Sequence, residues 1–171
     1  MHKLSSKKHG PEMPFAKFSG VLSLGGKELD AYVLSNEERV LSMRGMVAAM
    51  AQVDHGRVGE IPGAKVVLPL AFKDCAVGDF PEFLIPGNPR PAHGITAEQF
   101  IDFCRVYMEA VESGTLKGDK HRRIAMQCAA FLFSSAKVGL IALIDEATGY
   151  QAHRENDALQ VKVKAFVADE L

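Results

Sequence analysis

This chain of 171 residues contains two adjacent carboxylates, Asp145 and Glu146. A pair of carboxylates can act as the acid and the base of a catalysed reaction. We expect them near the end of a helix, where neighbouring residues point about 100° apart, so the two side chains do not converge on one atom. Negative charge at that end also opposes the helix dipole by a few tenths to about one kcal/mol. A compensating cation is therefore expected, either Arg154 or one of Arg122 and Arg123 from a neighbouring chain, and the motif is interpreted as a structural salt bridge.

A compact basic cluster, made of Lys120, His121, Arg122 and Arg123, is the second group with chemical potential. Such a cluster can bind the phosphates of DNA with salt-sensitive affinity, and a solvated or salt-bridged surface is the alternative interpretation. The chain has 20 basic and 21 acidic residues and a net charge of −1, so no overall field attracts nucleic acid. Any DNA contact must therefore be local.

The sequence contains no pattern typical of a metal site or a nucleotide site. Its six histidines stand singly, and none lies four residues from another on a helix. Gly25, Gly26 and Lys27 lead into a predicted strand rather than a helix, which excludes a phosphate-binding loop. The three cysteines, an odd number at wide spacings, are Cys75, Cys104 and Cys128. This pattern indicates reduced thiols in a cytoplasmic protein rather than disulfides or zinc ligands. We therefore expect no catalytic residues, no metal and no cofactor.

One long apolar helix, predicted from about Asp119 to Gly149, must position these candidates. Its residues 125 to 144 carry a single charge, Lys137. Such a helix reaches about 30 Å and could span a bilayer, but a lysine near its middle would cost about 2.5 to 3.5 kcal/mol. We favour the central helix of a globular core. Ser135 and Gly139 have the small-residue spacing that brings helices together, so a second copy of the chain could supply part of its cover.

The N-terminal third predicts a small antiparallel sheet followed by a helix. Apolar and polar residues alternate from residue 16 to 33 on both sides of Gly25 and Gly26, which predicts a β-hairpin. A third short strand is expected at 39–41. A helix capped by Ser42 is then expected from 43 to about 52.

The rest of the chain predicts a connection and a helical core. Residues 53–67 hold glycine and proline with little periodicity, which favours a loop. The short apolar segment at 68–77 could be helical, and the prolines of 81–94 favour extended or turning chain. Thr96 and Gln99 form a capping box that opens a helix with apolar residues every three or four positions. The predicted organisation is one compact domain in four parts: a disordered arm at 1–14, a strand-strand-strand-helix unit at 15–52, the loop-rich connection at 53–95, and the helical core at 96–171, with a last helix at about 154–167.

The segment AKVGLIALIDEATGYQ at 136–151 resembles the C-terminal domain family named for the myxobacterial phage protein p-sixty-three. The segments CRVYMEAVESGTL at 104–116 and RVLSMRGMVAAM at 39–50 are similar to parts of the same proteins. The resemblance implies a protein of phages and prophages that accompanies transcription regulators and antirepressors and has no enzymatic activity. The resemblance also implies a structural or interaction role for the residues at the positions of the family motif, which are Lys137, Asp145, Glu146, Gly149, Tyr150, Gln151 and Arg154.

Residues and resemblance together predict an α+β fold, in which a small N-terminal antiparallel sheet of three strands and a helix packs on a mainly helical core with one long buried helix. The expected function is that of a phage-derived, non-enzymatic regulatory protein: a DNA-associated transcription regulator or antirepressor-like protein, cytoplasmic, homo-oligomeric and without membrane contact. One alternative is a homo-oligomeric protein-interaction module without DNA binding. Another is an undescribed enzyme that uses Asp145, Glu146 and Tyr150. The residues expected to contact DNA are Arg39, Arg44, Lys120, Arg122 and Arg123.

Overall fold

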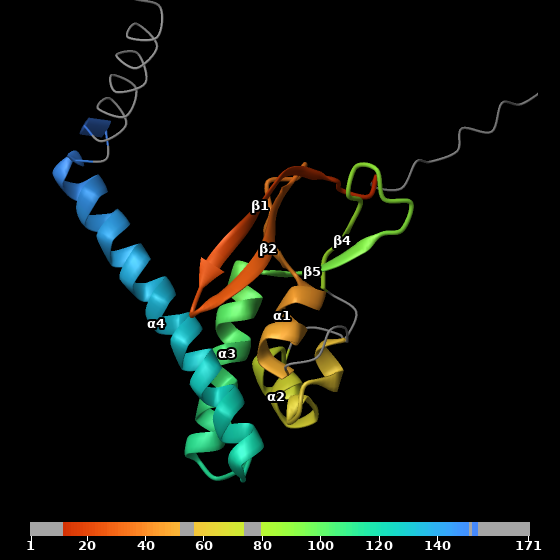
Figure 1. Cartoon of the computed structure of the whole chain (residues 1–171), viewed down its shortest axis with the longest axis vertical. Coiled ribbons are helices and arrows are strands. Elements are labelled where there is room, and N and C mark those ends of the chain that lie inside the picture. The colour runs from red at the N-terminus through yellow and green to blue at the C-terminus, as the bar shows by residue number, and fades with distance from the viewer. Residues whose placement is uncertain (1–11, 52–56, 74–79, 151, 154–171) are drawn as a thin grey trace, which may run out of the picture. The chain divides into compact units, whose positions relative to one another are not determined.

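A computed structural model of the protein describes residues 12–51, 57–73, 80–150 and 152–153 (Figure 1). The chain divides into two compact units, Met1–Leu132 and Phe133–Leu171, and each is described by itself. The described part of the first unit contains a sheet, helices α1 to α3 and the beginning of α4 (Asp119–Thr148), which continues into the second unit. The expected α+β class is confirmed. Most of the predicted arm and the predicted last helix lie outside the described residues.

An antiparallel sheet of five strands forms one layer of the first unit (Figure 1). Its first hairpin turns at Gly25 and Gly26, whose φ angles of 55° and 76° are the left-handed values that a tight hairpin turn requires. The predicted hairpin is therefore confirmed. The strands, in their order across the sheet, are β1 (Ala16–Leu24), β2 (Lys27–Leu34), β3 (Arg39–Ser42), β5 (Ala92–Thr96) and β4 (Glu82–Phe83).

Strands β4 and β5 correct the prediction of three strands, since both lie in the segment expected to be a loop-rich connection. β5 pairs with β3, with Ile95 opposite Leu41, and β4 pairs with β5. Pro81 and Pro91 favour a loop in the sequence, yet each stands immediately before a strand. A proline in that place removes no hydrogen bond from the ladder, so the sheet extends past both.

Helices α1 (Met43–Ala51) and α3 (Ala97–Glu112) begin at the capping residues that the sequence signals. The Ser42 hydroxyl oxygen accepts from the Gly45 backbone N–H at 3.2 Å. The Thr96 hydroxyl accepts from the Gln99 backbone N–H at 3.1 Å, and the Gln99 side-chain oxygen Oε1 accepts from the Thr96 backbone N–H at 3.0 Å. Both predicted caps are confirmed. A short 3-10 helix (Val58–Glu60) lies within the predicted loop. Helix α2 (Ala64–Ala71) overlaps the short apolar segment that the sequence marks as a candidate helix and begins four residues before it.

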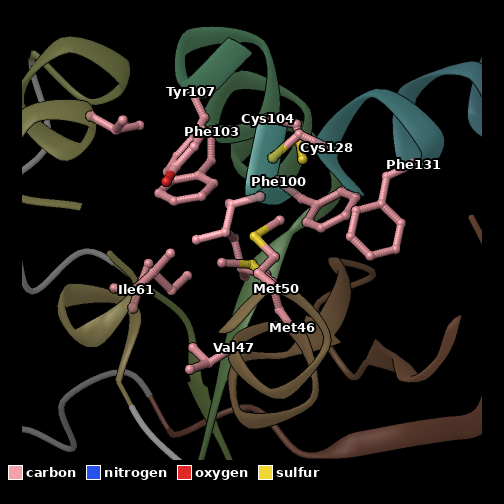
Figure 2. Packing of buried hydrophobic residues seen from close by; sticks show 14 of the residues in the cluster. Met46, Val47, Met50, Ile61, Phe100, Phe103, Cys104, Tyr107, Cys128 and Phe131 are labelled. Atoms are coloured by element: carbon pink, nitrogen blue, oxygen red, sulfur yellow. The ribbon is translucent and has the colours of Figure 1, made fainter. Parts of the chain in front are cut away.

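The hydrophobic core of the first unit lies between the sheet and the helices (Figure 2). Met46 and Val47 of α1 and Phe103 and Tyr107 of α3 are fully buried in it. The Tyr107 hydroxyl donates to the carbonyl oxygen of Pro62 at 2.6 Å, so its polar end is satisfied inside the core. This packing fixes α3, and α3 in turn receives the beginning of α4.

Candidate interaction surface

The first half of α4 is anchored in the core of the first unit. Ile124, Cys128 and Phe131 recur at four and three residues, which places them on one side of the helix, and all three are buried. The rings of Phe131 and Phe100 meet edge to face with their centroids 5.2 Å apart (Figure 2). This contact between α3 and α4 holds the anchored half in place.

The turn of the first hairpin closes over the same anchor. The Gln127 side-chain amide donates to the Gly25 carbonyl oxygen at 3.0 Å. A Cβ atom at Gly25 would lie 2.9 Å from Cδ1 of Phe131 and 3.0 Å from its backbone nitrogen. Gly25 therefore has two reasons to be glycine, its left-handed φ and its close approach to α4.

Beyond Leu132 the apolar side chains of α4 are exposed. Phe133, Leu140 and Leu143 expose 71%, 60% and 62% of their surface, and Val138, Ile141 and Ile144 are exposed as well. The prediction of one long buried helix is therefore wrong for the second half of α4. The side that packs into the core of the first unit ends at Phe131, and the helix continues past it. We call residues Phe133 to Ile144 the exposed apolar segment.

The acidic motif, Asp145 and Glu146, lies at the end of α4. Asp145 is buried, whereas Glu146 is exposed, so the two carboxylates lie in different surroundings. Gly149 has a φ of 73° and ends the helix, as expected. Tyr150 is exposed, and its ring centroid lies 6.0 Å from that of His153. The motif positions Gln151 and Arg154 lie outside the described residues.

The candidate DNA-binding residues fall into two groups that the structure does not bring together. Arg39, which donates to the Glu37 carbonyl oxygen at 3.4 Å, and Arg44 come from β3 and the first turn of α1. The other group lies at the start of α4, at the end of the first unit away from the sheet (Figure 1). There Arg122 pairs with Asp119 at 2.7 Å, and the remaining two members, Lys120 and Arg123, are exposed.

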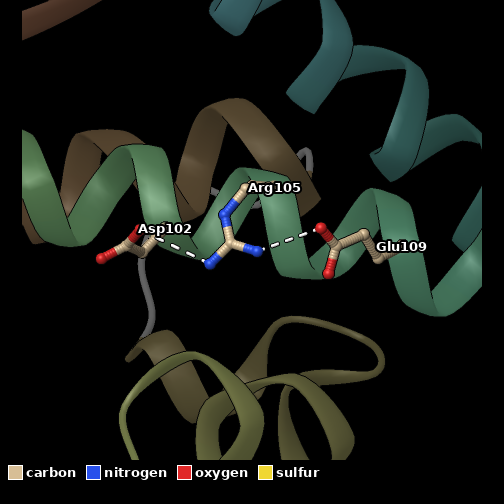
Figure 3. Close-up of polar contacts among 3 residues, drawn as sticks. All are labelled: Asp102, Arg105 and Glu109. Atoms are coloured by element: carbon tan, nitrogen blue, oxygen red, sulfur yellow. Dashed lines mark hydrogen bonds and ion pairs between the residues drawn. The ribbon is translucent and has the colours of Figure 1, made fainter.

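The outer face of α3 is a solvated, charged surface, as its sequence pattern predicts. Arg105 lies between two carboxylates, 3.7 Å from Asp102 and 3.0 Å from Glu109 (Figure 3). About half of each side chain is exposed, so pairs of this kind contribute about 0.3 to 0.5 kcal/mol each. The contrast with the second half of α4 is informative, because the face of α3 that is covered only by water carries charged side chains.

Two of the three cysteines are buried free thiols, which confirms the expectation for them; Cys75 lies outside the described residues. Cys104 of α3 and Cys128 of α4 lie side by side in the core (Figure 2). The hydrogen bond with the Cys128 thiol, together with burial, raises the pKa of Cys104 far above its usual range. A thiol that stays protonated is a poor nucleophile, so this pair contributes packing.

An apolar groove of about 350 Å³ lies on the face of the sheet near β1, and sequence reasoning missed it. Its wall includes Phe18 and Leu22 of β1 and Val33 of β2. Phe18 exposes 63% of its surface. The period-two pattern gives the side of the strand on which these residues lie, and it does not tell whether a helix covers that side.

Within the described residues no group of three or more His, Cys, Asp or Glu side chains is placed to hold a metal ion. Comparisons of the chain with family models, with curated proteins and with solved structures found no match. The resemblance to the phage domain family therefore stays a prediction. Function must be argued from the surface itself, and the exposed apolar segment is its most distinctive feature.

Proposed function

We propose that this chain is a self-associating protein-interaction module, in which a second copy covers one side of the exposed apolar segment of α4. One observation carries the proposal: Phe133, Leu140 and Leu143 each expose more than half of their surface along one helix. Contiguous apolar surface of this kind marks interaction sites, because isolated soluble proteins rarely leave it in water.

A bilayer is the other environment that could cover an apolar helix, and α4 is long and apolar enough to cross one, with a mean hydropathy of 1.7. Its first half, however, is anchored in the core of the first unit. Past Leu132 the helix continues for about 16 residues, or about 24 Å, which is shorter than the roughly 30 Å of a hydrocarbon layer. Lys137 lies within that length and is exposed. Protein cover is favoured, because a lysine beside a helix–helix contact can extend its ammonium group into water.

Size-exclusion chromatography with light scattering, run at several protein concentrations, tests the proposal. We expect a mass that is a multiple of the monomer mass of 18.6 kDa and that falls on dilution. A double substitution, Leu140→Glu with Leu143→Glu, should give a folded monomer. The matched control is Ile101→Glu, which changes an exposed apolar residue of α3 and should leave the mass unchanged.

A wild-type protein that is monomeric at every concentration would contradict self-association. Flotation with phosphatidylcholine vesicles separates the membrane alternative in the same samples. A monomer that floats with the vesicles would show that lipid, and not a second copy, covers the segment.

DNA association by a regulatory protein without catalytic activity is a second candidate. It is favoured by the exposed Lys120 and Arg123 at the first turns of α4, which self-association would present twice. Fluorescence anisotropy with duplex DNA at two salt concentrations tests it. Binding should weaken as salt rises, and Lys120→Gln with Arg123→Gln should make the salt dependence shallower by about one unit of slope for each phosphate interaction that the substitutions remove. Lys65→Gln, an exposed lysine of α2, is the control; absence of binding at low salt would remove this candidate.

A further inference from the structure

A regular apolar seam runs along the exposed side of α4. Counting from Met126 in alternating steps of three and four residues gives apolar positions throughout: Met126, Ala129, Phe133, Ala136, Leu140, Leu143 and Ala147. All are exposed except Ala129, which is partly buried, and Met126 and Phe133 expose 72% and 71% of their surface. A repeat of 3.5 residues is the pattern of a helix that packs along another helix.

The seam lies opposite the side of α4 that enters the core. In heptad notation the seam residues occupy positions a and d, with Met126 at a. Ile124 and Phe131 then occupy position f, and Cys128 occupies position c, on the other side of the helix. The seam and the anchored residues therefore lie on opposite sides of α4.

From these features we infer that two copies of the chain pair along this seam with their α4 helices antiparallel. The inference rests on the proposed self-association and adds to it the partner, the contact residues and the orientation. A heptad seam selects a helix with the same repeat, and a self-complementary surface generates a closed two-fold dimer. A second copy of α4 meets both conditions.

Side-chain size favours the antiparallel orientation. In a parallel pair each seam position meets itself, so Phe133 would meet Phe133 of the partner and Ala136 would meet alanine. Crowded layers would then alternate with empty ones, and both kinds are unfavourable. In an antiparallel pair a positions lie opposite d positions. With Phe133 level with the partner's Ala136, Leu140 is level with the partner's Ala129, so these layers each join a large side chain to a small one. Met126 is level with the partner's Leu143 at the two ends of the seam.

Charge favours the same orientation. The start of α4 is basic, with Lys120, Arg122 and Arg123, and its end is acidic, with Asp145 and Glu146. Both placements oppose the helix dipole. In the alignment given above, the basic start of each helix lies beside the acidic end of its partner, with Arg123 level with the partner's Glu146 on the opposite flank of the seam. A parallel pair would bring like charges together at both ends.

Cysteine cross-linking measures the orientation. In the antiparallel pair two copies of Leu140 are separated by about 16 Å along the axis, so Leu140→Cys should form no more disulfide-linked dimer under mild oxidation than the wild type does. An equimolar mixture of Leu140→Cys and Ala129→Cys should cross-link efficiently. Efficient self-linking of Leu140→Cys would overturn the antiparallel arrangement.

Charge reversal gives a second measurement on the folded protein. Arg123→Glu and Glu146→Arg each place like charges at helix ends that lie side by side, and each should weaken dimerisation about two- to fivefold, while the double variant, which restores opposite charge at those ends, should recover most of the wild-type affinity. Both single changes improve the match to the helix dipole, so weaker association would not reflect unfolding of α4. Additive loss in the double variant would contradict the pairing of the two ends.

A matched pair of variants tests the seam itself. Leu140→Asp lies on the seam and Val138→Asp lies off it, and the two wild-type side chains have similar exposure, 60% and 64%. We expect dissociation with the first and a dimer with the second; equal dissociation would overturn the seam. A monomeric wild type would instead remove the proposed function, so the two failures are distinguishable.

Discussion

Two phenylalanines two residues apart should respond in opposite ways to the same truncation. Phe131 is fully buried and packs edge to face on Phe100, whereas Phe133 exposes 71% of its surface. Phe131→Ala removes a buried ring and leaves a cavity, which costs about 3 to 5 kcal/mol of unfolding free energy. The aromatic contact accounts for about 0.5 to 1.5 kcal/mol beyond the buried area. This contact is part of the 3 to 5 kcal/mol, which for a chain of 171 residues corresponds to a fall in Tm of about 6 to 20 °C.

Phe133→Ala should leave the unfolding free energy of the monomer within about 0.5 kcal/mol of the wild type, because a surface truncation removes little buried area. Phe133→Ala should instead weaken self-association, which light scattering at several protein concentrations would show as a higher dissociation constant of the dimer. Urea denaturation followed by circular dichroism, at a concentration low enough for the wild type to be monomeric, measures the first quantity. Equal destabilisation by the two substitutions under those conditions would refute the distinction between a core side and an exposed side of α4.

Three further changes test the packing that positions α4. Gly25→Ala should cost about 1 to 3 kcal/mol in urea denaturation, since its Cβ would lie 2.9 Å from Phe131, while Gly26→Ala, with open space around it, should cost less. Thr96→Ala should cost about 1 kcal/mol and Thr96→Ser should restore most of it, because the serine hydroxyl can cap α3. Tyr107→Phe should cost about 1 to 2 kcal/mol near neutral pH by leaving a carbonyl without its donor. Burial raises the pKa of Tyr107 above the value of roughly 10 that tyrosine has in the unfolded chain, so the wild type loses stability as the pH rises past about 10. The difference in unfolding free energy between the wild type and Tyr107→Phe should therefore become smaller above that pH.

Local signals in the sequence sufficed for the elements whose conformation is decided within a few residues. The Gly25–Gly26 turn requires left-handed backbone at both positions, and the caps at Ser42 and Thr96 satisfy N–H groups three residues ahead. Strands β4 and β5 could not be found in this way. β4 has two residues, too few for a period, and β5 pairs with β3 across some fifty positions of sequence, so its place is decided by a distant partner.

A different reason explains why the sequence did not predict which part of α4 is buried and which part is exposed. An apolar stretch of helix has the same composition whether protein core, lipid or a second chain covers it. The deciding factor is how far the first unit reaches along the helix, and that depends on Phe100 and the turn at Gly25, both remote in sequence. The acidic motif was predicted from helix geometry alone, since adjacent positions point apart, and the contrast between buried Asp145 and exposed Glu146 agrees with that argument.

The position of Lys137 connects the two sides of α4. The first turns of the helix use positions c and f for their own core, and the proposed pairing uses positions a and d. Lys137 falls at position e, on the border of the seam, where its aliphatic part can lie along the partner helix while its ammonium group reaches water. At a or d the same charge would be buried between the two copies. The single charge in twenty residues therefore stands where a helix covered on one side by another copy can accommodate it, and a helix surrounded by lipid has no such border.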